Sequence, residues 1–129
     1  MTGAPNQALL IVDGFNVLHA AVLHGRDRRG WRGPAARARL LTAVAAARPP
    51  ARGDVIVVFD DPSPPPVPSG EGPVVVHAPD ADEWIVARVQ ADSRPERISV
   101  ATADRPLGDR ARTAGATVVG PRTLLGRDP

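Results

Sequence analysis

The sequence contains no cysteine and no lysine, and aromatic residues make up only 3% of its 129 residues. The absence of cysteine excludes disulfides and thiolate zinc sites, and it fits a protein of a reducing compartment. Because aromatic side chains are so few, the hydrophobic core has to be built from valine, leucine, isoleucine and alanine. Hydrophobic residues reach 43%, which is a globular composition.

Long apolar segments are missing as well. No apolar run approaches ~18 residues, the length expected of a transmembrane helix. No basic segment followed by a short apolar stretch marks a secretory leader. We therefore expect a soluble cytoplasmic protein, and a chain of this length fits one domain around a single core.

The basic residues are all arginine, 16 of them against 14 acidic residues, so the formal net charge is +2. Guanidinium groups bind phosphate through paired hydrogen bonds, which favours a nucleic-acid partner. Codon bias gives the same composition, because alanine, glycine and proline are abundant too. The position of the arginines is more informative than their number.

One loop, residues 25–33, concentrates basic side chains around a tryptophan. Its arginines could bind an RNA backbone while the indole stacks on a base. A solvated surface turn is the alternative interpretation of the same loop. The residues expected to contact RNA are Arg26, Arg28, Arg29, Arg32 and Trp31.

Short runs of branched apolar residues alternate with helical stretches along the chain. The alternation predicts an α/β fold, a parallel sheet with helices on both faces. Right-handed crossovers and one reversal of direction give a three-layer Rossmann-like domain with five strands in the order 3-2-1-4-5. We expect this domain at 8–125, between tails at 1–7 and 126–129. Strands are expected near 8–12, 54–60, 74–76, 97–102 and 117–119, and helices near 17–24, 34–48, 81–91, 106–114 and 121–126.

Three of the expected strands deliver an acidic residue to one edge of the sheet. Asp13 and Asp60 end the first two strands, and Asp104 closely follows the fourth. In parallel α/β folds, ligands bind beyond the carboxyl ends of the strands. The strand order places Asp13 and Asp104 on either side of the switch point. Asn16 follows at a position that suits the N-cap of the next helix.

The helix expected at 81–91 begins with three acids in different roles. Asp80 suits the N-cap, and Glu83 stands at capping-box spacing and points towards solvent. Asp82 falls on the buried stripe with Ile85, at the helix end nearest the carboxyl ends of the strands. The helix dipole is an alternative reason for an acid at this position.

Asp13, Asp82 and Asp104 together predict a metal site. Carboxylates that converge on a partly dry cleft raise each other's pKa, and a divalent cation removes this penalty. Oxygen donors without histidine or cysteine suit Mg²⁺ or Mn²⁺. Such a site favours metal-assisted hydrolysis of a phosphodiester. Asp61 and Asp109 are expected in solvent, and Asp104 by itself could simply close a turn.

Other chemistries find no support in the sequence. No two histidines share a helix face, and a serine or cysteine triad lacks candidates. Neither Gly-x-x-x-x-Gly-Lys nor a GxGxxG follows the first strand. A phosphoacceptor receiver domain also clusters acids at strand ends, but it normally uses a lysine, which this chain lacks.

Five short motifs in this order resemble the NYN domain, specifically its YacP-like branch within the PIN-like nuclease superfamily. They are LLIVDGFNVLH at 9–19, VVFD at 57–60, ADEWI at 81–85, ATADRPL at 101–107 and AGATVVGP at 114–121. The resemblance covers about residues 8–125. It implies a Mg²⁺- or Mn²⁺-dependent endoribonuclease on a sheet ordered 3-2-1-4-5.

By position, the resemblance implies that Asp13, Asp82 and Asp104 are the metal-binding acids. It matches Asn16 to the carboxamide beside the first acid and Asp60 to the aspartate at the end of the second strand. We expect these two residues to orient water or substrate, so all five form the expected catalytic set.

Two departures from the family pattern bear on the function. Phe15 replaces the commoner tyrosine, which removes a hydroxyl. Residues 34–48 contain no acid, whereas many PIN nucleases carry one on the second helix. A catalytically weak module that binds RNA or a ribosomal partner is therefore the alternative function.

Overall fold

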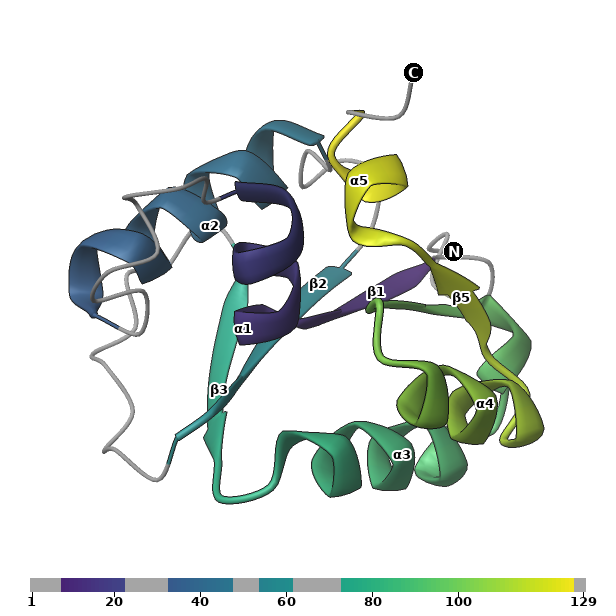
Figure 1. Ribbon diagram of the computed structural model, residues 1–129. Helices are drawn as coiled ribbons and strands as arrows, with labels where there is room; N and C mark the ends of the chain where they lie inside the picture. The colour runs from purple at the N-terminus through teal and green to yellow at the C-terminus, as the bar shows by residue number, and fades with distance from the viewer. Residues whose placement is uncertain (1–7, 23–32, 48–53, 62–72, 127–129) are drawn as a thin grey trace, which may run out of the picture.

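The computed structural model describes residues 8–22, 33–47, 54–61 and 73–126. Within these residues, five strands form one parallel sheet in the order β3-β2-β1-β4-β5 (Figure 1). This confirms the predicted fold class and strand order. The strands are β1 (Leu9–Asp13), β2 (Asp54–Asp60), β3 (Val74–Ala78), β4 (Ile98–Ala101) and β5 (Thr117–Val119).

Helices of the described residues follow β1, β3, β4 and β5, as predicted. They are α1 (Gly14–Val17), α2 (Pro34–Ala47), α3 (Ala81–Ala91), α4 (Arg105–Thr113) and α5 (Pro121–Leu124). A π-helical turn, η2 (Leu18–Val22), continues α1, and a 3₁₀ turn, η5 (Pro95–Arg97), precedes β4. No helix in the described ranges has both the length and the apolar character to cross a membrane. The expected tail at 1–7 lies outside the described residues, and so does the expected tail at 126–129 except for residue 126.

Strand β1 lies in the middle of the sheet, between β2 and β4, and all its residues are buried. A branched aliphatic sequence suits a strand that is covered on both faces. The register pairs Asp13, at the end of β1, with Val58 of β2. Asp13 therefore lies at the C-terminal edge of the sheet, where ligands of parallel α/β domains bind.

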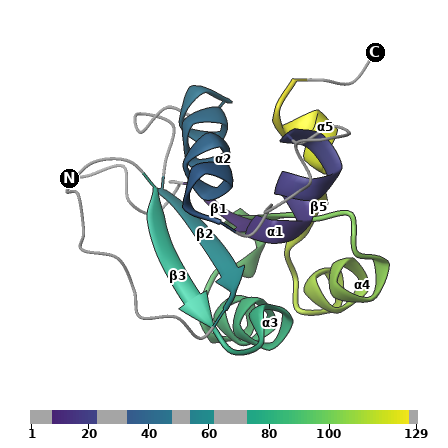
Figure 2. The same cartoon turned by 60° about the vertical axis from the view of Figure 1, so that its left-hand side comes forward.

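Two helical layers cover the sheet: α1, α2 and α5 lie on one face, and α3 and α4 on the other (Figures 1 and 2). Alternate residues of β1 point to the two layers. Leu10 and Val12 join the core with α1 and α2, whereas Leu9 and Ile11 join the core with α3 and α4. The core is almost entirely aliphatic, as the scarcity of aromatic residues predicts.

The first helix begins earlier than the sequence suggests. It starts at Gly14, directly after β1, and Asp13 is its N-cap residue without a side-chain capping bond. A Cβ atom at Gly14 would lie 2.7 Å from the Phe59 ring and 2.8 Å from the Val58 carbonyl oxygen. Only glycine allows so close a turn from strand to helix. Asn16 is consequently inside the helix, and its predicted role as the N-cap is wrong.

Candidate functional site

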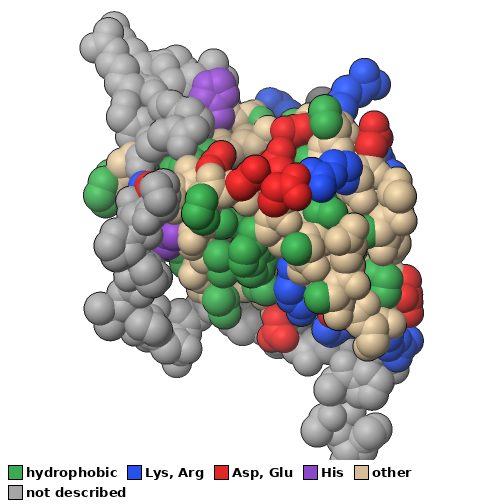
Figure 3. Space-filling view, turned by 90° about the horizontal axis from the view of Figure 1, so that it is seen from below, with side chains coloured by type: hydrophobic (Ala, Val, Ile, Leu, Met, Phe, Trp, Pro, Cys, Tyr) green, Lys and Arg blue, Asp and Glu red, His purple; other side chains and the backbone are tan. Residues whose placement is uncertain are grey.

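Acidic side chains gather in one patch on the face seen in Figure 3. They surround a cavity of about 450 Å³ beyond the C-terminal ends of β1 and β2. Four predicted site acids from four different elements line it: Asp13, Asp60, Asp82 and Asp104. The remaining lining residues are Phe15, Asn16, His19, Ala20, Asp80 and Ala81.

Asp13 is the buried member of this group, with 8% of its surface exposed. Burial is the main cause that raises the pKa of its carboxyl to about 6. A hydrogen bond from Thr102 opposes the rise, and the charges of Asp82, Asp104 and Asp60 add to it. A carboxylate in this position destabilises the fold when it is ionised, which is typical of a functional residue rather than a structural one.

Thr102 connects the ends of β1 and β4. Its Oγ1 donates to Asp13 Oδ2 at 2.8 Å and accepts from the backbone N–H of Asp104 at 3.0 Å. Thr102 is only 4% exposed, and a buried hydroxyl needs such partners. Sequence analysis missed this residue, although it stands two positions before Asp104 in the ATADRPL motif.

Asn16 ties the first helix to the same loop. Its side-chain Oδ1 accepts a 2.7 Å hydrogen bond from the backbone N–H of Ala103. This contact replaces the capping role that we expected. Because Oδ1 is engaged, the amide NH₂ is the part of the side chain that can donate to a bound molecule.

Asp104 combines a structural role with a place in the cavity. It is the N-cap of α4, and its Oδ1 accepts from the backbone N–H of Leu107 at 3.1 Å. Closing a turn, which the sequence left open as an alternative, is therefore a real part of its role. The positive end of the α4 dipole also favours a negative charge here.

The acids at the start of α3 separate as their positions on the helix predict. Asp82 is half-buried and faces the cavity, and its pKa is raised by burial and then by the charges of Asp104, Asp80 and Asp60. Asp80 caps the helix, accepting from the backbone N–H of Glu83 at 3.2 Å, and it also lines the cavity.

The Glu83 side chain does not complete the expected capping box. It forms a bidentate ion pair with Arg110 of α4 instead, at 2.6 Å and 3.2 Å. The positive charge of Arg110 acts to lower the pKa of Asp82, against the effects that raise it. A cation therefore stands beside the acidic cavity, where the sequence indicated none.

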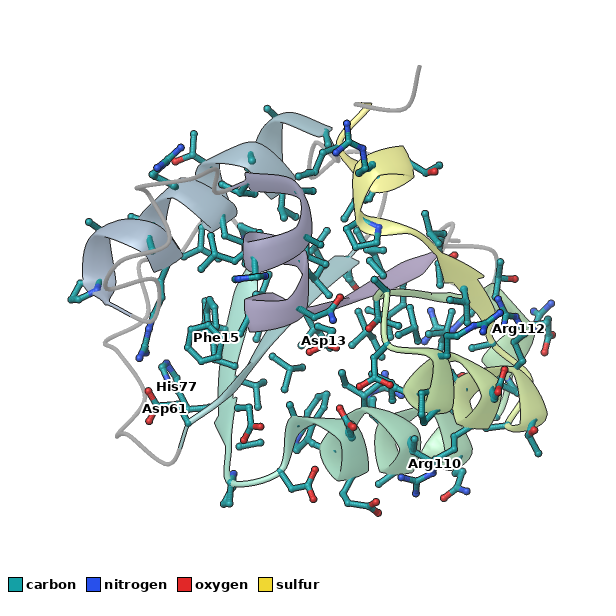
Figure 4. The ribbon with its side chains drawn as sticks, viewed as in Figure 1. Asp13, Phe15, Asp61, His77, Arg110 and Arg112 are labelled. Carbon is teal, nitrogen blue, oxygen red and sulfur yellow. The ribbon has the colours of Figure 1, made fainter. Side chains whose placement is uncertain are left out.

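Asp60 and Asp61, at the end of β2, have different surroundings. Asp60 is exposed and lines the cavity. Asp61, which we expected in solvent, is half-buried and ion-paired with Arg37 of α2, so that prediction is wrong. The Arg37 guanidinium lies 5.3 Å from the Phe15 ring centroid and 5.4 Å from that of Phe59. Figure 4 labels Phe15 and Asp61 at this corner of the sheet.

The residues that we expect to contact RNA in the arginine-rich loop are not among those that the structure describes. They are Arg26, Arg28, Arg29, Arg32 and Trp31. One basic side chain that the sequence did not assign to the site, His19 of η2, lines the cavity. A search for pairs of histidines on one helix face misses His19, which stands alone one helical turn after Asn16.

Divalent cations such as Mg²⁺ bind oxygen ligands, and the cavity is lined by carboxylates that could supply them. In the described part of the chain, no three His, Cys, Asp or Glu side chains are arranged to ligate one ion directly. Mg²⁺, however, usually binds through one or two carboxylates and keeps several waters. Five carboxylates around one cavity, with raised pKa values at Asp13 and Asp82, fit a partly hydrated ion of this kind.

Comparisons with known proteins agree with the fold. A family model described as the YacP-like NYN domain matches residues 10–127. Two crystal structures of Rae1 (YacP) from Bacillus subtilis share the fold. One, at 26% identity and a TM-score of 0.68, covers 92% of this chain and 71% of the other. The second, a tryptophan-to-leucine variant, has 25% identity and a TM-score of 0.69, with 92% and 73% covered. No curated protein is significantly similar in sequence.

Proposed function

The chain belongs to the YacP-like NYN domain family, and from this membership and its acidic cavity we propose that it is a divalent-metal-dependent endoribonuclease. The observation that carries the proposal is the meeting of four acids from β1, β2, α3 and the start of α4 around one cavity. Capping of α4 accounts for Asp104, but folding gives no such reason for Asp13, Asp60 and Asp82, because like charges held together destabilise the native state.

Asp13, Asp82 and Asp104 would hold Mg²⁺ or Mn²⁺ in part through water molecules that the ion keeps. When bound, the ion would supply positive charge for the phosphate oxygens and lower the pKa of a bound water. Thr102 keeps one oxygen of Asp13 in place, and the α4 cap does the same for one oxygen of Asp104. The protein thus fixes the orientation of two acids before any ligand arrives, which lowers the cost of binding.

The remaining cavity residues would form hydrogen bonds to the attacking water and to the RNA. Asp60 can accept a hydrogen bond from the attacking water, and the Asn16 amide can donate to a phosphate oxygen. His19 can donate to a phosphate or to the leaving oxygen. Water would add to phosphorus, the bond to the leaving oxygen would break, and that oxygen would take up a proton.

Incubation with labelled single-stranded RNA, with and without Mn²⁺, tests the proposal. We expect the unmodified protein to cleave only when the metal is present. Asp13→Asn should leave the RNA intact under the same conditions. Cleavage that continues in excess chelator, or in Asp13→Asn, would contradict a metal site built on this residue.

An RNA- or ribosome-binding module without appreciable activity is the second candidate. It is favoured by α2, which carries no acid and instead places Arg37 against Asp61. Such a module would bind RNA but leave it intact across Mg²⁺ and Mn²⁺ on several substrates. The same incubation, combined with a binding measurement, separates the two functions.

A further inference from the structure

A second hollow lies between α3 and α4, outside the acidic cavity. It has a volume of about 290 Å³. The residues that line it are Val86, Gln90, Asp109, Arg110, Thr113 and Ala114. Buried Val86 and half-buried Ala114 give it an apolar part, and the other four side chains are exposed and polar. We refer to these six residues as the α3–α4 groove.

The α3–α4 groove and the acidic cavity both take lining residues from α3. Asp82 of the cavity and Val86 and Gln90 of the groove are spaced i, i+4 and i+8 on α3. Residues at this spacing lie on one face, and each step is about one helical turn of ~5.4 Å. A chain-like ligand bound at Asp82 can therefore extend directly into the groove.

Arg110 stands between the two hollows. It lines the groove, and its bidentate ion pair with Glu83 holds it beside Asp82, the preceding residue of α3. Figure 3 shows a basic side chain against the acidic patch, and Figure 4 labels Arg110 beside α3 and α4. A cation at this junction suits an anionic group that crosses from one hollow to the other.

Stability does not account for the pair that holds Arg110. The side chains of Arg110 and Glu83 are 46% and 62% exposed, and exposed ion pairs contribute little to folding. The bidentate contact does fix the guanidinium plane. It uses only part of the five N–H donors of arginine, so the others remain available for a phosphate.

We propose that the α3–α4 groove is a second RNA subsite, which holds the nucleotide next to the one at the acidic cavity. Arg110 binds the phosphate between the two nucleotides, and Val86 and Ala114 contact the base. Gln90 and Thr113 offer hydrogen bonds to the base edge. The volume is at the small end of the ~300–1,000 Å³ range of ligand pockets, which suits one nucleotide. This subsite rests on the proposed ribonuclease function.

Binding measurements without metal test the subsite, because the RNA then stays intact. The probes are a single-stranded RNA that extends on both sides of the mapped cleavage position and a series shortened by single nucleotides from either end. Arg110→Gln should weaken binding of the long RNA about tenfold and make the log-affinity slope against log salt shallower by about one. RNAs too short to reach the groove should bind both proteins equally.

Two further variants complete the test. One is a control for the loss of an exposed arginine, and the other blocks the groove without a change of charge. Arg94→Gln removes an arginine from a comparable exposed pair, with Glu96, and should change affinity less than twofold. Thr113→Phe fills the groove without changing charge, and it should reproduce the length-dependent loss. Thr113 is exposed, so this substitution leaves the core intact.

The outcomes separate the subsite from the proposed function. Equal losses in Arg110→Gln and Arg94→Gln, or equal losses for short and long RNAs, would overturn the subsite while cleavage by the unmodified protein continued. A protein that neither binds nor cleaves RNA of any length would overturn both.

Discussion

Thr102 Oγ1 donates a 2.8 Å hydrogen bond to Asp13 Oδ2, which joins the end of β4 to the end of β1 across 89 positions of sequence. The acceptor is a buried carboxyl, and burial raises its pKa to about 6. The hydrogen bond from Thr102 acts in the opposite direction, because it stabilises the charged form of Asp13. The first two predictions follow from this pair.

Thr102→Val should destabilise the protein, and more so at high pH. A hydrogen bond to a charged group contributes about 1.5–3 kcal/mol, and the bond from Thr102 has this strength only when Asp13 is ionised. We expect a loss of roughly that size in the free energy of unfolding at pH 8, from urea denaturation. At pH 4.5 the loss should be smaller, and Thr102→Ser should be close to the original at both pH values. A loss that does not depend on pH would mean that Asp13 is not the partner that matters.

Asp13→Asn should stabilise the metal-free protein above neutral pH. The folded-state pKa of about 6 lies above the ordinary value of 3.8 for an aspartic acid, so folding favours the protonated acid. Its contribution to stability is fully present below pH 3.8 and is lost as the pH rises through 6. At pH 8 the variant should gain about 1–3 kcal/mol, given ~1.4 kcal/mol per pKa unit. Denaturation at pH 8 and pH 4 checks this, and a gain of the same size at both pH values would contradict it.

Millimolar Mn²⁺ should raise the melting temperature, because an ion that binds only the folded state stabilises it. Asp82→Asn should abolish the rise, since Asp82 lines the cavity. Glu83→Gln, at the next position of the same helix, should keep it, because Glu83 lies outside the cavity lining and pairs with Arg110. Loss of the thermal shift in both variants would show that the helix face does not decide metal binding.

Asp60→Asn should lower the cleavage rate by at least ~10²-fold, which corresponds to about 2.7 kcal/mol of activation free energy. Asp60 lies at the exposed edge of the cavity, where it can orient water, and neither capping nor core packing explains it. RNA affinity should barely change, because arginines supply most of it. Single-turnover kinetics with saturating protein measure the effect. A cleavage rate equal to that of the unmodified protein would remove Asp60 from the site.

Replacing Arg28 and Arg29 with alanine should weaken RNA binding. If both contact phosphates, the slope of log affinity against log salt should become shallower by roughly one for each lost contact. Fluorescence anisotropy over a salt series measures the slope. An unchanged slope would assign residues 25–33 to a solvated surface turn.

The local sequence predicted most of the elements and the places of Asp80, Asp82 and Glu83, although not the ion pair of Glu83 with Arg110. Val55 to Phe59 and Ile98 to Ala101 are apolar runs whose length and branching indicate buried strands, and the parallel order followed from crossover handedness. Helical spacing separated Asp82 from Glu83, because the angle between neighbouring side chains is set by the helix itself. Asp80 was expected only as a cap, yet it also lines the cavity.

Contacts between distant elements were beyond such reasoning. The local sequence favours Asn16 as a cap because its neighbours suit a helix start, but Gly14 packs so closely on Phe59 that the helix begins three residues earlier. The prolines that follow Asp61 favour a position in solvent, but Asp61 forms an ion pair with Arg37 of α2. Arg110 and Glu83 are 27 residues apart, and no local pattern connects them.

The sequence by itself determined the α/β class, the strand order, the family, and the acids at the strand ends, because each depends on composition, short-range periodicity and motif order. Only the tertiary structure decided which side chains meet: Thr102 with Asp13, Asn16 with Ala103, and Arg110 between the acidic cavity and the α3–α4 groove. The physical reason is that these contacts depend on the register of β1 against β4 and on the packing of α3 against α4. Register and packing are set by the whole core, so no single stretch of sequence encodes them.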